Sequence, residues 1–390
     1  MATLGIIAAN VVLTVVLRHG FDNAARDYGI IPSQFRMGRL ITSAFIHDGF
    51  LHLSMNMILL YIFGSRLERT VGKLEFGLFY IGACFASSLT HIAIVFASLP
   101  PYYATRAVVG ASGAVAGVMG LYAVRFHRKM FRVGGVEVSA LFLIIIWLVL
   151  QLIMGVIALY ADDFLGLRLR HVAYWSHLGG FAFGIITALI ANMALQGERE
   201  YLTSESRRNE NEGNLLGAAQ NYETLIKYDP DNASAHANLA RLWAMMDEET
   251  QSLPYYRNAI KLYTSQGKED EALAVNEDMK RRWPHARLST ARRFRLASYM
   301  AEVGKYERAI QTFRDIADRD PQSPEAQMSL IKIGHLQLST LADPSASIAT
   351  INSFLTRYPK SEWRKLAEEM LERAKDVAFQ QSVLFPAGDL

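Results

Sequence analysis

The chain has 390 residues, of which 51% are hydrophobic, and its formal net charge is +3. This near balance conceals a division along the chain. Of the 77 charged side chains (40 Lys and Arg, 37 Asp and Glu), 22 fall in residues 1–197 and 55 in the remainder. The first half is too apolar for an ordinary soluble domain, whereas the second has the charge content of a solvated one. We therefore expect a membrane domain followed by a water-soluble domain.

Six apolar stretches in the first half are long enough to cross about 30 Å of hydrocarbon. They are centred on residues 2–17, 51–65, 76–98, 112–124, 138–160 and 173–195. The short loops after the second and fourth stretches are rich in Arg and Lys, which is typical of cytoplasmic loops. Because an even number of spans returns the chain to its starting side, we expect both termini in the cytoplasm. The first stretch lacks a basic leader and a small-residue cleavage site, which favours its retention in the mature protein.

Several isolated polar side chains in this half have simple structural interpretations. Cys84 is the only cysteine, so a disulfide within the chain is excluded and a packing role is favoured. Glu68 lies at the inner end of the second stretch, where we expect an ion pair with Arg66 or Arg69. His47 is expected to form hydrogen bonds within the first loop.

Two reactive side chains lie inside the apolar stretches. Ser112 opens the fourth stretch and His177 lies in the sixth. At 1.5 Å per helical residue, both lie at a similar depth from the inner ends of their helices. Polar groups at membrane depth are costly and indicate function, and a hydroxyl beside an imidazole is the minimal activated nucleophile. A lone serine in such a stretch would be interpreted as a packing residue, but its pairing with His177 favours catalysis.

Glycines explain how the two helices that carry these residues could approach each other. Gly113 and Gly117 form a GxxxG pair on the fourth stretch, and Gly180 and Gly184 form another on the sixth. Small residues let helix backbones pack closely in lipid. We expect the two pairs to bring Ser112 against His177.

A third polar cluster begins the second stretch. His52 and Asn56 are four residues apart and therefore share one helix face. Both can donate hydrogen bonds to a developing oxyanion, as can the backbone N–H groups at the start of the fourth helix. For Asn56, hydrogen bonding between helices without catalysis is an equally good interpretation.

Together these residues resemble a known family, the rhomboid intramembrane serine proteases. The matching set, in chain order, is Arg39, His47, His52, Asn56, Gly110-Ala111-Ser112-Gly113, Gly117, His177, Gly180 and Gly184. The resemblance covers residues 1 to about 195.

The resemblance implies roles for four residues. Ser112 is the nucleophile and His177 the general base of a dyad, while His52 and Asn56 stabilise the oxyanion together with the Ser112 backbone. It also implies that no cofactor is needed, and that the substrates are transmembrane proteins cut at or near their membrane segment. No metal is expected either, because Asp162 and Asp163 lie in a loop without a cluster of His or Cys. Ala116 stands where the family often has an aromatic ring stacked on the catalytic histidine, which leaves the orientation of His177 to other neighbours.

Beyond residue 212 a three-residue register recurs four times, with offsets of four and twelve. Each set begins with a small residue, has a second helix residue four positions later, and has a proline twelve positions after the first. The four sets are Ala218, Tyr222, Pro230; Ala272, Asn276, Pro284; Ala309, Phe313, Pro321; and Ser347, Ile351, Pro359. The small residue permits close helix approach, the next fills the groove between helices, and the proline ends the second helix of a pair. The spacing is near the 34 residues of a tetratricopeptide repeat, which the unit from Gly304 to Pro321 resembles closely.

We therefore predict an all-α chain with two folded domains. The first domain is a six-transmembrane-helix rhomboid bundle in residues 1–197. The second is a soluble α-solenoid of tetratricopeptide-like helical pairs in 213–378, with an additional helix around 253–263. A linker in 198–212 joins them, and a tail follows in 379–390. Such repeats usually bind peptides or protein segments, so we expect an unknown cytoplasmic protein or peptide as partner. Nucleic acid is disfavoured because the repeat domain is net negative.

The predicted function is intramembrane serine endopeptidase, in the plasma (inner) membrane of a bacterium. One alternative is a proteolytically inactive rhomboid-like protein that binds membrane proteins for sorting. Retention of Ser112, His177, His52 and Asn56 argues against it. A transporter is a second alternative, but it predicts further charged residues in mid-span, and the sequence offers almost none.

Overall fold

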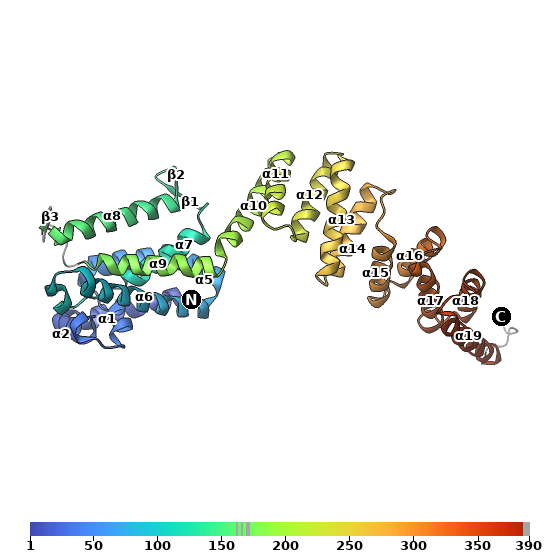
Figure 1. Ribbon diagram of the computed structural model, residues 1–390, viewed down its shortest axis with the longest axis horizontal. Helices are drawn as coiled ribbons and strands as arrows, with labels where there is room; N and C mark the ends of the chain where they lie inside the picture. The colour runs from blue at the N-terminus through green and yellow to red at the C-terminus, as the bar shows by residue number, and fades with distance from the viewer. Residues whose placement is uncertain (161–162, 165–166, 169–171, 385–390) are drawn as a thin grey trace. The chain divides into compact units, whose positions relative to one another are not determined.

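The structure is a computed structural model that describes residues 1–160, 163–164, 167–168 and 172–384 (Figure 1). It divides into two compact units, Met1–Tyr201 and Leu202–Leu390. The boundary falls within the segment predicted as a linker, which is helical here. Both units are built from helices, so the predicted fold class is confirmed.

Within the described residues, ten α-helices form the first unit and the start of the second. They are α1 (Ala2–Leu17), α2 (Phe21–Tyr28), α3 (Arg39–Thr42), α4 (Gly49–Leu59), α5 (Ser65–Val71), α6 (Lys73–Ser98), α7 (Ser112–Arg125), α8 (Ala140–Tyr160), α9 (Tyr174–Ile190) and α10 (Met193–Asn211). A π-helical turn, Leu60–Gly64, joins α4 to α5 without a break. The short strands β1 (Met130–Val133) and β2 (Val136–Ser139) form one antiparallel hairpin, and β3 (Asp163–Phe164) and β4 (Leu167–Arg168) form another.

Four helical segments of the described chain are long and apolar enough to cross a membrane. They are Ala2–Tyr28, Gly49–Val71, Lys73–Ser98 and Ala140–Tyr160. A fifth arises if α9 and α10, bent by 70°, count as one span. The predicted number of six is therefore not confirmed. The fourth predicted span corresponds to α7, whose 14 residues extend only about 21 Å. These segments nonetheless make the first unit an integral membrane domain.

The short helix α7 is the core of this unit. Residues 113–123 are all buried, and α7 packs against both α6 and α9. A Cβ atom on Gly180 would lie 1.9 Å from the Gly113 carbonyl oxygen, and one on Gly184 would lie 2.0 Å from that of Gly117. The predicted close approach of the two glycine pairs is confirmed, and it leaves no room for any side chain at these contacts.

Glu68 differs from its predicted role. Its carboxylate accepts hydrogen bonds from the backbone N–H groups of Ala2 (2.7 Å) and Thr3 (2.9 Å) and from the Thr3 hydroxyl (2.7 Å). The expected ion pair with an arginine is therefore wrong. A buried carboxylate is stabilised at the start of α1 because the first N–H groups of a helix have no partners within the helix.

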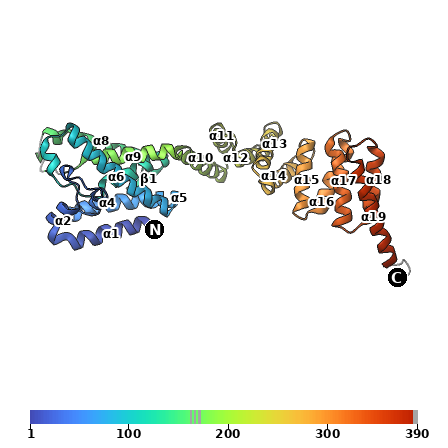
Figure 2. The same cartoon turned by 60° about the horizontal axis from the view of Figure 1, so that its bottom comes forward.

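The second unit consists of helices that each pack on their neighbours in the sequence (Figures 1 and 2). They are α11 (Leu215–Tyr228), α12 (Ala233–Met245), α13 (Glu249–Ser265), α14 (Glu269–Arg282), α15 (Thr290–Glu302), α16 (Tyr306–Arg319), α17 (Pro324–Ser339), α18 (Pro344–Arg357) and α19 (Arg364–Leu384). The last helix continues into the predicted tail, whose residues 385–390 lie outside the described chain.

The predicted register explains the packing of these helices. The first two residues of all four sets are buried, including Ala218, Ala309 and Phe313. Each proline lies two residues beyond the helix that carries its set. Stacked helical pairs of this kind form a solenoid in which each repeat contacts only its neighbours.

Candidate active site

Ser112 and His177 meet where α7 and α9 begin. The hydroxyl Oγ of Ser112 lies 2.7 Å from Nε2 of His177, and His177 is buried. A hydroxyl can donate its proton to an imidazole nitrogen only when that nitrogen carries no hydrogen. The other ring nitrogen decides whether this condition is met.

Gln151, which lies on α8, contacts the other ring nitrogen and so leaves Nε2 of His177 without a hydrogen. Its carboxamide oxygen Oε1 lies 2.7 Å from Nδ1 of His177. Because a carbonyl oxygen only accepts hydrogen bonds, Nδ1 of the neutral ring carries the hydrogen and Nε2 is left free to accept from Ser112. The sequence analysis did not single out Gln151. The available signal was its position as an amide side chain in an otherwise apolar helix.

Aromatic rings surround the imidazole on other sides. The ring centroid of Trp147 lies 6.0 Å from that of His177, and Tyr174 approaches edge-on with a centroid distance of 6.3 Å. Ala116 is fully buried, and its methyl group replaces the aromatic ring that the family often has at this position. Gln151, Trp147 and Tyr174 are thus the neighbours that orient His177.

The backbone before Ser112 is held by the first loop. Val108 and Ile30 exchange two backbone hydrogen bonds of 2.8 and 2.9 Å, and the N–H of Gly110 donates to the Ser43 carbonyl at 2.9 Å. The N–H of Ala111 donates to Nε2 of His47 at 3.2 Å. These contacts fix the start of α7, where the first N–H groups of the helix are available to a ligand.

His52 lies beside the same point of the chain. Gly110 has a positive φ of 123°, and a Cβ atom there would lie 2.9 Å from Nε2 of His52 and 3.7 Å from Oγ of Ser112. Asn56 is placed differently, because its Nδ2 donates to the His52 carbonyl oxygen within α4 at 3.1 Å. The structure thus gathers Ser112, His177 and His52 and places Asn56 one helical turn away on α4.

A small cavity of about 20 Å³ adjoins Ser112. Its lining includes Ser87 and Ser176. A cavity of this size holds about one water molecule, provided that polar partners surround it.

Comparison with known proteins assigns both units. The family model of the Rhomboid domain matches residues 34–193, and models of the tetratricopeptide repeat match residues 210–267 and 293–323. This chain contains a rhomboid domain followed by tetratricopeptide repeats. The resemblance seen in the sequence is thereby confirmed.

Three curated relatives illustrate the similarity of the rhomboid domain. "Rhomboid protein 1, mitochondrial" of Saccharomyces cerevisiae is 31% identical over 172 residues, 41% of this chain and 44% of that protein. "Rhomboid protease GluP" of Bacillus subtilis is 34% identical over 109 residues, 27% of this chain and 20% of that protein. "Inactive rhomboid protein 1" of Drosophila melanogaster is 36% identical over 81 residues, 21% of this chain and 5% of that protein. The chain spans less than half the length of these relatives.

Proposed function

We propose that this protein is an intramembrane serine endopeptidase that cleaves transmembrane proteins at or near their membrane segment. The observation that carries the proposal is the 2.7 Å contact between Ser112 Oγ and His177 Nε2, with Gln151 on the opposite ring nitrogen. A protein that only binds membrane segments has no need of a hydroxyl aligned on the unprotonated nitrogen of a buried imidazole.

The first chemical step is acylation of Ser112. Its Oγ attacks the carbonyl carbon of the scissile peptide bond while its proton passes to Nε2 of His177. Gln151 keeps the ring oriented as it becomes an imidazolium. The negative oxygen of the tetrahedral intermediate is stabilised by the Ser112 N–H, by His52 and by the N–H of Asn56 that is not bonded to its own helix.

The second step releases the products. His177 gives its proton to the leaving amine, which departs as the new N-terminus of one fragment. It then takes a proton from a water molecule that attacks the acyl-enzyme ester. When the bond between the acyl carbon and Ser112 Oγ breaks, His177 returns this proton to Oγ, and the other fragment leaves with a free carboxylate. The small cavity beside Ser112 supplies a position for that water. No cofactor or metal takes part in either step.

The location and partners follow from the two units. We place the membrane domain in a bacterial plasma membrane with both termini in the cytoplasm, because the loops after the second and fourth predicted spans are basic. The repeats bind a cytoplasmic protein or peptide and not nucleic acid. They act on proteolysis by recruiting proteins to the membrane domain.

The alternative is a rhomboid-like scaffold without protease activity. The similarity to a relative named "Inactive rhomboid protein 1" favours it. A scaffold function, however, gives the contact between Ser112 and His177 no role.

Labelling with a fluorophosphonate probe distinguishes the two functions, since this reagent reacts with an activated serine. We expect one adduct, located on Ser112 by peptide mass spectrometry, and none in Ser112→Ala or His177→Ala. Ser88→Ala is the matched control, because the Ser88 hydroxyl is buried nearby and donates only to the Leu40 carbonyl at 3.2 Å. A folded wild-type protein that takes up no probe would support the scaffold instead.

A further inference from the structure

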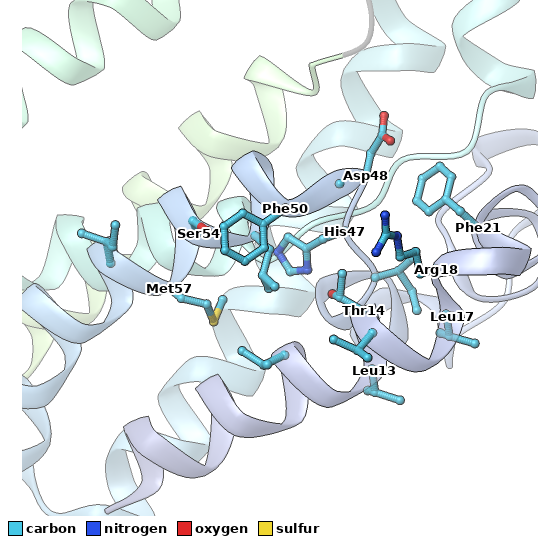
Figure 3. A pocket seen from close by; sticks show the side chains of 16 residues that line it. Leu13, Thr14, Leu17, Arg18, Phe21, His47, Asp48, Phe50, Ser54 and Met57 are labelled. Atoms are coloured by element: carbon cyan, nitrogen blue, oxygen red, sulfur yellow. The ribbon is translucent and has the colours of Figure 1, made fainter.

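A cavity of about 770 Å³ opens between α1, the loop before α4 and α4 itself (Figure 3). Its walls are mainly apolar and include Leu13, Leu17, Phe50 and Met57. Phe50 is 81% exposed, so the cavity opens toward the surroundings of the membrane domain. The reaction at Ser112 does not use this cavity.

Two buried polar atoms of residues that line the cavity have no hydrogen-bond partner among the described residues. They are Nδ1 of His47, a residue that is 3% exposed, and Oγ1 of Thr14. Nε2 of His47 accepts the N–H of Ala111, so Nδ1 of the neutral ring must carry the hydrogen and act as a donor. The Thr14 hydroxyl is also a donor. Buried donors of this kind are normally satisfied, which calls for a ligand with an acceptor oxygen.

Two charged side chains line the same cavity. Figure 3 shows the Arg18 guanidinium close to Thr14 and His47, whereas the Asp48 carboxylate points away from these side chains. Neither Arg18 nor Asp48 forms an ion pair within the described chain. Arg18 follows Thr14 by one helical turn, or about 6 Å along the axis. The cavity thus combines apolar walls with two hydrogen-bond donors (His47 and Thr14), one cation (Arg18) and one anion (Asp48).

We propose that this cavity binds one glycerophospholipid with an ammonium-bearing headgroup, such as phosphatidylethanolamine. An ester carbonyl oxygen of the lipid accepts hydrogen bonds from His47 and Thr14. The adjoining phosphate pairs with Arg18, the ammonium pairs with Asp48, and the acyl chains lie along the apolar sides of α1 and α4. Both headgroup charges are matched, whereas an anionic headgroup would leave Asp48 beside a negative charge.

The lipid site is connected to the start of α7 through a single side chain. His47 contacts the lipid through Nδ1 and the Ala111 N–H through Nε2. A bound lipid therefore stabilises the backbone that precedes Ser112. This consequence can be measured as amide protection, without reference to any enzymatic activity.

Native mass spectrometry of the purified full-length protein tests the site. After removal of bound lipid, the protein is titrated with phosphatidylethanolamine or with phosphatidylglycerol of the same acyl chains. We expect one tightly held phosphatidylethanolamine and weaker binding of phosphatidylglycerol. Arg18→Gln should weaken phosphatidylethanolamine binding roughly 10-fold, the scale of one hydrogen bond to a charged group. Thr14→Val, which keeps the shape of the side chain, should weaken it by a smaller factor.

Arg36→Gln serves as the control, because Arg36 is an exposed arginine of the same unit that does not line this cavity. Hydrogen exchange of the peptide that contains residues 108–114 gives a second readout, and it should slow when phosphatidylethanolamine binds the wild type. Equal binding of both lipids, or equal binding by wild type, Arg18→Gln and Thr14→Val, would overturn the proposal. So would preferential binding of phosphatidylglycerol.

Discussion

Nδ1 of His177 lies 2.7 Å from Oε1 of Gln151, on the opposite side of the imidazole from Ser112. A neutral carboxamide thus occupies the place that a carboxylate takes in many serine hydrolases. It fixes the tautomer of the ring without adding a second charge within the membrane, where an ionised side chain is costly. The proposed dyad therefore has a third, uncharged member that positions its base.

Gln151→Leu should slow cleavage about 10- to 100-fold, because the buried Nδ1–H loses its acceptor at a cost of roughly 1–3 kcal/mol. The loss should fall on kcat more than on KM, since Gln151 orients the base and does not hold the substrate in this account. Steady-state kinetics on a transmembrane model substrate measures both. A rate equal to that of wild type would mean that packing by Trp147 and Tyr174 orients His177 without help.

The pH dependence of the rate should change when Gln151 is replaced by Glu. In the wild type, cleavage falls as the pH is lowered, because an imidazolium cannot accept the Ser112 proton. A carboxylate beside Nδ1 stabilises the imidazolium, so the rise in rate should move to higher pH in Gln151→Glu. Single-turnover rates across a pH series record this shift. An unmoved profile would contradict the contact between residues 151 and 177.

Gly110→Ala should abolish most activity. The new Cβ would lie 2.7 Å from Cε1 of His52, and the φ of 123° is unfavourable for any residue with a side chain. Gly135→Ala separates the clash with His52 from the backbone strain. Gly135 also has a positive φ, of 88°, but a Cβ there contacts nothing within 4 Å. We expect Gly135→Ala to cost only about 1 kcal/mol of stability and to remain active. Equal activity of the two variants would argue against the crowding of His52.

Truncation should preserve the membrane domain only if the start of α10 is kept. Arg125 is buried and pairs with Glu200, and Arg128 pairs with Glu198 at 3.1 Å. A protein that ends at Tyr201 keeps both acidic residues, so it should cleave a small model substrate in detergent while losing selection of the natural substrate in cells.

A protein that ends at Asn192 lacks both acidic residues and also Gly197, which packs against Arg125. Arg125 then loses both its ion-pair partner and part of the helix that covers it. This shorter protein should show a lower melting temperature and reduced activity. Identical melting temperatures for the two truncations would show that these ion pairs contribute nothing to the fold.

Local patterns in the sequence were sufficient for most of the fold. Residues three or four apart share a helix face, so the repeat register and the glycine pairs could be derived directly. The similar depths of Ser112 and His177 and the two glycine pairs also predicted that these residues meet. Contacts between distant segments were not accessible in the same way: the bond from Gln151 to His177 joins α8 to α9, and Glu68 meets residues at the start of the chain. The count of six spans is not confirmed, because α7 has only 14 residues and is too short to count as a span by its length.

The most direct test of the central claim is cleavage of a transmembrane model substrate by the purified full-length protein in proteoliposomes, compared with Ser112→Ala and Ser88→Ala. Wild type and Ser88→Ala should release two fragments cut at or near the membrane segment, and mass spectrometry should find no such fragments with Ser112→Ala. Ser112→Ala should melt at the same temperature as the wild type, because a single hydroxyl is removed. Equal cleavage by folded Ser112→Ala and wild type would contradict the assignment of Ser112 as the nucleophile.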